Sequence, residues 1–399
     1  MGATMLAATT DANLCYITAE QAVAAFKARQ LSPVELMRAV IPRCESVNPK
    51  VNALTHMYFD WALEEAKEAE RRYARGGGNP RPLEGIQLAI KDLHPVKGEI
   101  TTWGSKIFEG VRADYTLPIV QRLLDAGAIL HIRTTTPEFA HTGHCHSPLW
   151  GATRNPWNTE YSSGGSSGGS AVAVATGMTT LADGDDGGGS IRIPSSANGV
   201  FGFKPPFGRN RGCLLPTNHD WILHLGPITR SVGDAIIMQN IMSGSHPDDI
   251  VSLKPKIDVP LKGGSMKGKK VAFSMDLGYF PVDSEVRQNT LAAVDVFKSL
   301  GGDVVEGRCR LESGSLRRLD DSLGRAVRLC GRPPPSSMEV RDGSLCKGTA
   351  RARHQPQLCQ GQANGVRAGR DVQEAQSHPS RARVSAVSPD RRAVGCGMA

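Results

Sequence analysis

The sequence predicts an α/β protein in which a central mixed β-sheet is flanked by helices. Short apolar segments of strand length, at residues 86–90 and 128–132, alternate with segments of helical periodicity. Two glycine-rich segments, at residues 162–170 and 184–190, occupy the middle of the chain. The chain has 399 residues, of which 40% are hydrophobic, and this length and composition allow it to bury a sizeable core.

The N-terminal part predicts three helices. Thr18 and Gln21 form a capping box ahead of the run AVAAFKARQ. Ser32 and Glu35 form a second capping box, with a proline in the first helical turn. A third helix is predicted over residues 58–75. It ends there because a run of three glycines follows.

Strands and helices then alternate. A strand at residues 86–90 ends at Lys91, a helix covers 118–126, and a second strand covers 128–132. The Gly/Ser loop at 162–170 leads into a helix at 171–177, and residues 184–190 are predicted as a turn. Further along, the pattern predicts a strand at 271–274, a helix at 284–300 and a strand from 302 to 306.

The composition changes abruptly near residue 307. Residues 307–399 carry 17 Lys and Arg against 8 Asp and Glu and contain no Phe, Trp, Tyr or Ile, whereas residues 1–306 carry 30 basic against 31 acidic side chains. Such a segment cannot bury enough apolar area to offset its ordering entropy. We therefore expect one large domain over residues 1–306, incomplete at its C-terminal end, and an Arg/Gly/Ser/Pro-rich tail over 307–399. The tail is either disordered or translated out of frame, and resequencing the gene across this point separates the two.

The net charge of +8 belongs to this tail, so the body has no electrostatic reason to bind nucleic acid. The tail itself lacks the aromatic residues that stack on bases. The nine cysteines include no C-x-x-C pair, so we expect neither a disulfide framework nor a zinc site and favour a cytoplasmic location. We expect no membrane segment and no secretory signal, because apolar runs of the required length and flanks are missing.

The two glycine-rich segments carry the chemical signal. They read GGSSGGS at 164–170 and GDDGGGSIRIP at 184–194. A flexible Gly/Ser linker is the simplest alternative, but linkers do not run directly into an apolar helix. Glycine-rich turns ahead of helices point backbone N–H groups at one spot, which suits a negatively charged oxygen. Seryl hydroxyls beside such a spot indicate nucleophilic catalysis.

These segments, with AIKD at 89–92, GATRNPWN at 151–158 and GFKP at 202–205, resemble the amidase signature family over about residues 15–306. The spacing also agrees, with 75 residues from Lys91 to Ser166 and 24 from Ser166 to Ser190. The resemblance implies the amidase-signature fold and hydrolysis of a carboxylic acid amide, with aryl acylamides, esters and carbamates as variants. It implies a small-molecule amide substrate and neither metal nor cofactor. The oligomeric state stays open, with a homodimer as one arrangement.

The resemblance also implies a Ser-Ser-Lys triad. Ser190 would be the nucleophile that accepts the acyl group. Ser166, held by a cis peptide bond after Gly165, would bridge Ser190 to Lys91. Lys91 would be the general base, neutral in the resting enzyme, and would later return a proton to the leaving amine.

Around the nucleophile, the resemblance implies an oxyanion hole and a supporting ion pair. The backbone N–H groups of Gly187, Gly188 and Gly189, with that of the nucleophile, would bind the oxyanion. Asp186 and Arg192 would hold this loop.

One departure and two rival functions follow from the same motifs. Many family members have Thr or Ile where this chain has Gly187, and we expect the glycine to alter substrate fit while keeping the backbone donor. The A subunit of glutamyl-tRNA(Gln) amidotransferase shares the triad but usually has Gln in place of Ile193, so a free-standing amidase is favoured. An inactive, truncated amidase is the third reading, because the altered tail replaces the part that would close the pocket.

Three competing motifs are weaker. Ser167 sits in a G-x-S-x-G sequence, but no strand is predicted before it. The run GGSMKGKK at 263–270 nearly matches a phosphate-binding loop, yet a lysine stands where Ser or Thr should bind magnesium. The cluster of His141, His144, Cys145 and His146 has no helical or finger spacing, so a loop near the pocket is expected in place of a metal site.

Overall fold

The computed structural model describes residues 11–75, 80–211, 222–278 and 280–307. The predicted tail beyond residue 307 lies outside the described residues. Contacts divide the chain into two compact units. Among the described residues, the first unit extends to Ser265 and the second begins at Met266.

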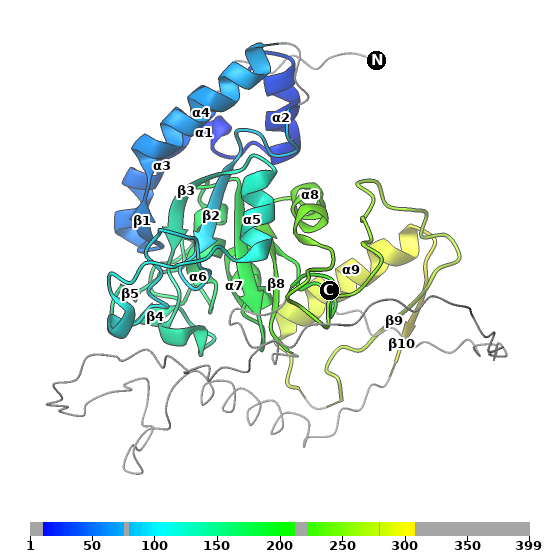
Figure 1. Cartoon of the computed structure of the whole chain (residues 1–399). Coiled ribbons are helices and arrows are strands. Elements are labelled where there is room, and N and C mark those ends of the chain that lie inside the picture. Colours follow the sequence, from blue (N-terminus) through cyan, green and yellow to red (C-terminus); the bar gives the residue numbers. More distant parts are fainter. Residues whose placement is uncertain (1–10, 76–79, 212–221, 279, 308–399) are drawn as a thin grey trace, which may run out of the picture. The chain divides into compact units, whose positions relative to one another are not determined.

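A six-stranded mixed sheet forms the centre of the first unit (Figure 1). Three adjacent strands run parallel, the strand on each side of these three pairs antiparallel with its neighbour, and the sixth strand pairs antiparallel with the fifth. Every residue of the four longest inner strands is buried, as expected where helices cover both faces of a sheet. The predicted fold class is therefore confirmed. The strand order is β1 (Leu54–Met57), β3 (Ile129–Thr134), β2 (Gln87–Lys91), β6 (Leu181–Asp186), β8 (His224–Thr229) and β7 (Phe201–Gly202).

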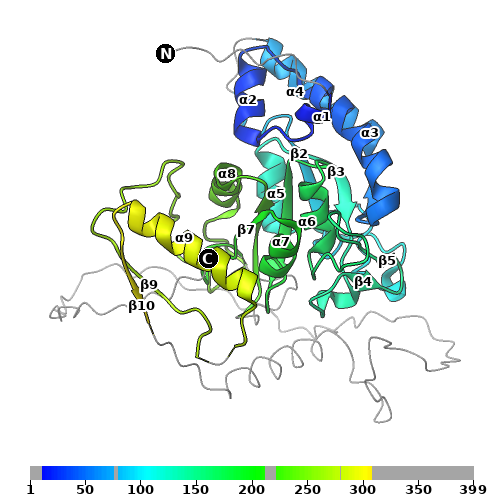
Figure 2. The same ribbon diagram turned by 180° about the vertical axis from the view of Figure 1, so that it is seen from behind.

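Helices surround this sheet (Figures 1 and 2). Helix α4 packs on α3 and on β3, α6 contacts β2, β6 and β8, and α8 packs on β8 and α5. No helix in the described ranges is long and apolar enough to cross a membrane. The helices of this unit are α1 (Asp11–Leu14), α2 (Ala19–Lys27), α3 (Pro33–Val51), α4 (Phe59–Ala74), α5 (Pro118–Asp125), α6 (Gly168–Ala175), α7 (Arg192–Asn198) and α8 (Val232–Met242).

The predicted capping boxes both form. The Thr18 hydroxyl accepts a bond from the Gln21 N–H (3.1 Å), and the Gln21 side chain accepts one from the Thr18 N–H (3.2 Å). Ser32 and Glu35 exchange the same two bonds at 3.1 and 2.8 Å. These bonds satisfy N–H groups that a helix start otherwise leaves free, which fixes where α2 and α3 begin.

The turn predicted over residues 184–190 is wrong in its first half. Residues Leu181–Asp186 form β6, which pairs in parallel with β2 and antiparallel with β8. Gly and Asp have low strand propensity, so pairing with two buried neighbours overrides the local preference. Helix α6 also begins at Gly168, three residues before the predicted start.

The second unit has a parallel strand pair joined through a helix. Its elements are β9 (Lys270–Phe273), α9 (Ser284–Ser299) and β10 (Asp303–Glu306). These match the predicted strand, helix and strand to within one or two residues. The hydrophobic pattern of the sequence is therefore sufficient to predict the type and order of these three elements.

Replacing Gly169 by alanine is expected to destabilise the first unit by about 1–3 kcal/mol, because the first turn of α6 packs directly on the backbone beside it. A Cβ on Gly169 would lie 2.6 Å from the Ala53 carbonyl oxygen and also collide with the backbone nitrogen of Thr135. Chemical denaturation followed by circular dichroism measures the loss. Gly263→Ala is the matched control, since a Cβ there meets nothing within 4 Å; equal stability of the two variants would contradict this packing.

Acidification below pH 6.5 is expected to cost stability through His131, a buried residue of β3. One ring nitrogen lies 2.9 Å from the Met178 carbonyl oxygen, and burial lowers the pKa of His131 to about 4. The unfolded chain therefore binds this proton first, so stability falls from pH 6.5 to about 4, by up to about 3 kcal/mol. The difference in unfolding free energy between the wild type and His131→Gln should shrink as the pH falls from 6.5 to about 4, because the wild type alone loses this stability. A difference independent of pH would rule out the effect.

Candidate active site

Lys91 is the centre of the candidate site. It is the last residue of β2, and its side chain is completely buried. Its ammonium nitrogen Nζ lies 2.7 Å from the Ser166 hydroxyl and 3.1 Å from the Ser167 hydroxyl. The same nitrogen also contacts the carboxylate of Asp185. The two serines lie 75 and 76 residues after Lys91 in the sequence, and they contact it because the loop ahead of α6 passes the carboxyl end of β2.

The two serines that contact Lys91 lie in the glycine-rich loop. The Gly165–Ser166 peptide bond is cis, and both Ser166 and Ser167 are buried. Gly165 lets this loop pass close to another segment, because a Cβ on it would lie 2.7 Å from the carbonyl carbon of His144. The backbone thus holds the two hydroxyls against the lysine.

Ser190 lies in the second glycine-rich segment, between β6 and α7. Its carbonyl oxygen accepts a bond from the Ser167 N–H at 3.1 Å, which joins the two glycine-rich segments at the site. The residue is half-buried. Among the described residues, no hydrogen bond involves its hydroxyl. The structure therefore brings Lys91 and Ser166 into direct contact and joins the backbone of Ser190 to Ser167, the residue after Ser166.

Asp186 holds the loop that carries Ser190. Arg192 binds its carboxylate bidentately, with Nε and Nη2 each 2.9 Å from a carboxylate oxygen. The Lys204 ammonium lies 3.3 Å from the same group. Burial opposes the charge, but the bonds and charges of Arg192 and Lys204 hold the pKa of Asp186 below its ordinary value. The loop is thus fixed around a buried, ionised carboxylate.

The backbone donors at this loop are divided between two tasks. The Gly189 N–H donates to Asp186 at 2.8 Å and so supports the loop. Within the described part of the chain, the N–H groups of Gly187, Gly188 and Ser190 make no hydrogen bond. These three N–H groups are therefore available to an acceptor other than the loop's own carboxylate.

Two carboxylates and a histidine that the sequence analysis did not select complete the site. Asp183 lies 2.6 Å from Nδ1 of His94 and accepts the Lys91 backbone N–H at 2.8 Å. Asp185 lies 3.4 Å from Nε2 of His94. Burial alone would lower the pKa of His94, but the two carboxylates raise it above its ordinary value. Burial would raise the pKa of Asp185, but Lys91 and His94 hold it well below its ordinary value.

A sequence signal for these residues was present. Asp183 and Asp185 are two apart, so in a strand they project from the same face. The prediction of a turn over residues 184–190 separates Asp185 from Asp183 and so hides this pattern. His94 follows Lys91 by three residues, and only the chain's turn after β2 brings it back beside β6.

The rival motifs form no second centre. His141, His144 and His146 are exposed while Cys145 is buried, and among the described residues no cluster of three or more His, Cys, Asp or Glu could hold a metal ion. A nucleophile elbow requires a strand that leads directly into the serine, and the described residues 153–166 ahead of Ser167 form none. The run at 263–270 leads into β9 and not into a helix, so it is no phosphate-binding loop.

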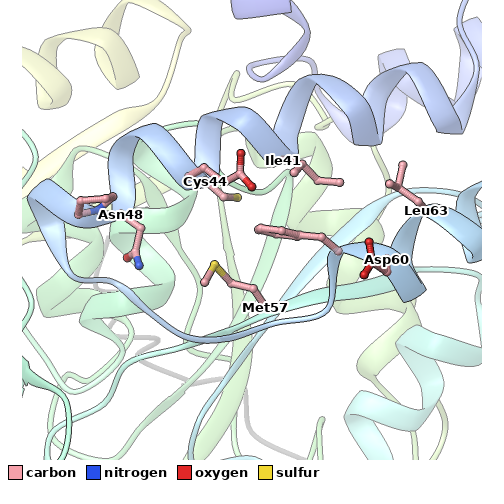
Figure 3. A pocket seen from close by; sticks show the side chains of 9 residues that line it. Ile41, Cys44, Asn48, Met57, Asp60 and Leu63 are labelled. Atoms are coloured by element: carbon pink, nitrogen blue, oxygen red, sulfur yellow. The ribbon is translucent and has the colours of Figure 1, made fainter.

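A pocket of about 630 Å³ lies elsewhere, between α3 and α4 (Figure 3). It is lined by Ile41, Cys44, Glu45, Asn48, Pro49, Met57, Phe59, Asp60 and Leu63. None of these belongs to the cluster around Lys91, so this pocket is not the candidate site.

Comparisons with known proteins identify the family of this chain. The sequence is 38% identical over 300 residues to an acylamidase of Rhodococcus erythropolis. The aligned region covers 74% of this chain and 62% of that protein. It is 37% identical over 290 residues to the glutamyl-tRNA(Gln) amidotransferase A subunit of Brachyspira hyodysenteriae, covering 70% of this chain and 59% of the relative. The chain thus spans about three fifths of the length of these relatives.

A solved structure of a bacterial aryl acylamidase from the amidase signature enzymes superposes with a TM-score of 0.73 at 30% identity, covering 79% of this chain and 65% of that one. A 6-aminohexanoate cyclic dimer hydrolase superposes with a TM-score of 0.65 at 31% identity, covering 74% of this chain and 61% of that one. The family described as Amidase matches residues 35–315. This chain therefore belongs to the amidase family, whose structures are those of the amidase signature enzymes.

Proposed function

We propose that this chain hydrolyses a carboxylic acid amide through a seryl acyl-enzyme. The observation that carries the proposal is the buried contact of 2.7 Å between the Lys91 Nζ and the Ser166 hydroxyl, beside the segment that bears Ser190. A hydroxyl relay to a buried amine is a route by which a serine can lose its proton. The acylamidase and aryl acylamidase among the relatives support the reaction class.

In the proposed reaction, the Ser190 oxygen attacks the amide carbon. Its proton passes to Ser166 as the Ser166 proton passes to the neutral Lys91 amine, so the O–H bonds of Ser190 and Ser166 break while a new Ser166 O–H bond and a Lys91 N–H bond form. The new carbon–oxygen bond forms as the π electrons of the carbonyl group move to its oxygen. The Lys91 ammonium then returns a proton through Ser166 to the leaving nitrogen as the carbon–nitrogen bond breaks. Water hydrolyses the resulting ester and restores the free serine.

Charge develops on the carbonyl oxygen during both steps. The N–H groups of Gly187, Gly188 and Ser190 are the donors proposed to bind it. Each such donor is worth roughly 3–4 kcal/mol of transition-state stabilisation in enzymes that use this device. The Asp186–Arg192 pair fixes the loop, so these donors need little reorganisation when the substrate binds.

The proposed substrate is a small linear amide, with aryl acylamides, esters and carbamates as related candidates. The names of the acylamidase and the aryl acylamidase support the first two. A cytoplasmic location is proposed on the cysteines, because in the described part of the chain Cys44 and Cys145 are free thiols and are buried.

A second candidate is the A subunit of a glutamyl-tRNA(Gln) amidotransferase, which the relative from Brachyspira hyodysenteriae favours. Ile193 and Gly187 stand where that protein usually has Gln and Thr, and this supports the free-standing amidase. Affinity purification from the native cell separates the two. A co-purifying partner protein that confers glutaminase activity would favour the amidotransferase.

Lys91→Ala, Ser166→Ala and Ser190→Ala are each expected to lower kcat/KM for an anilide substrate by at least about 10³-fold, because each removes one member of a proton relay that acts as a unit. Initial rates over a panel of anilides, aliphatic amides and esters measure this.

The controls are matched in residue type. Lys97→Ala and Ser196→Ala remove exposed side chains of the same kinds and should retain the wild-type rate. Wild-type kcat/KM in Lys91→Ala would remove the proposed mechanism.

A further inference from the structure

The proposed general base has an unexpected neighbour. The Lys91 ammonium contacts the Asp185 carboxylate, and the two side chains are 0% and 3% exposed. Among the described residues, Asp185 is the one carboxylate that binds this ammonium. Asp183 also contacts Lys91, but through the backbone N–H of Lys91 and not through its side chain. A carboxylate in direct contact with an amine in a poorly solvated site strongly favours the charged form of that amine.

The charges around this pair balance. His94 lies between Asp183 and Asp185, at 2.6 and 3.4 Å, and all four ionisable side chains are buried. With Lys91 and His94 protonated and both carboxylates ionised, the net charge of the cluster is zero. A buried charge without a partner is costly, so loss of one carboxylate would favour loss of one proton.

The position of each carboxylate decides which proton is lost. Without Asp185, Lys91 has no carboxylate partner, whereas His94 keeps Asp183. Without Asp183, His94 loses its shorter contact, whereas Lys91 keeps Asp185. The two aspartates are therefore equivalent in charge but not in effect on the lysine.

Other charged groups face the cluster from neighbouring elements, and none of them contacts the Lys91 ammonium in the described structure. The Arg133 guanidinium, on β3, donates to the carbonyl oxygens of Lys91 and His94 at 3.2 and 2.8 Å. Asp92 lies 3.9 Å from Arg133. Asp186, at the end of β6, is engaged by its own two cations.

We propose that Asp185 is a positioning residue that holds Lys91 as an ammonium ion, in place of the neutral resting amine that the family resemblance implies, so that hydrolysis requires a pH high enough to release that proton. This inference rests on the proposed role of Lys91 as the general base. An ammonium nitrogen has no lone pair, so Lys91 must first lose a proton to solvent before it can accept the one from Ser166. The ammonium that reforms during acylation is again next to Asp185, which stabilises it.

The test follows the charge of Lys91 directly. The full chain is produced with ¹³Cε-labelled lysine, and the resonance that is absent from Lys91→Arg is followed by NMR from pH 5 to 11. In Asp185→Asn, this resonance should change from the ammonium to the amine position at least about one pH unit below the wild type. Asp183→Asn, on the same strand, should match the wild type.

Two results would overturn the inference: an unchanged Lys91 titration in Asp185→Asn, or an equal shift in Asp183→Asn. Asp185→Ser serves as a second variant if the asparagine chain fails to fold, as judged by circular dichroism. The acid limb of kcat/KM for an anilide should move to lower pH in the same variant. An inactive wild type with the expected NMR shift would refute the proposed function and leave the Lys91–Asp185 coupling supported.

Discussion

The buried side chain of Lys91 is the constraint on which the rest of the site depends. A lysine with no exposed surface must have its nitrogen satisfied by neighbouring polar groups, and here Ser166, Ser167 and Asp185 supply them. Those neighbours lie on two segments that are far from β2 in sequence. The parallel pairing of β2 with β6 and the close passage of the Gly/Ser loop are what bring them together.

The same constraint accounts for the glycines. The loop before α6 must approach other backbone segments closely, and at Gly165 and Gly169 a single added carbon would collide with them. In the loop after β6, Gly189 has a φ of 128°, and a Cβ on it would lie 2.7 Å from Cδ1 of Ile193. The conformational freedom of glycine thus permits close packing in both glycine-rich segments.

Local rules predicted part of this structure and missed the rest for physical reasons. Capping residues such as Thr18 and Ser32 act through bonds three residues away, so the starts of α2 and α3 could be predicted. The strand Leu181–Asp186 could not be, because its glycine and aspartates are poor strand formers that are ordered by their neighbours β2 and β8. The candidate triad residues came from motif resemblance, whereas His94, Asp183 and Asp185 required three-dimensional contacts.

The central claim is that the nucleophile is Ser190 and not one of the serines that touch Lys91. Covalent labelling of the wild type with a fluorophosphonate, followed by tryptic digestion, tests it most directly. The peptide from residue 155 to 192 contains Ser166, Ser167 and Ser190, so fragment ions must assign the adduct within it. We expect an adduct on Ser190 that is lost in Lys91→Ala. An adduct on Ser166 or Ser167 would show that one of these serines is the nucleophile instead.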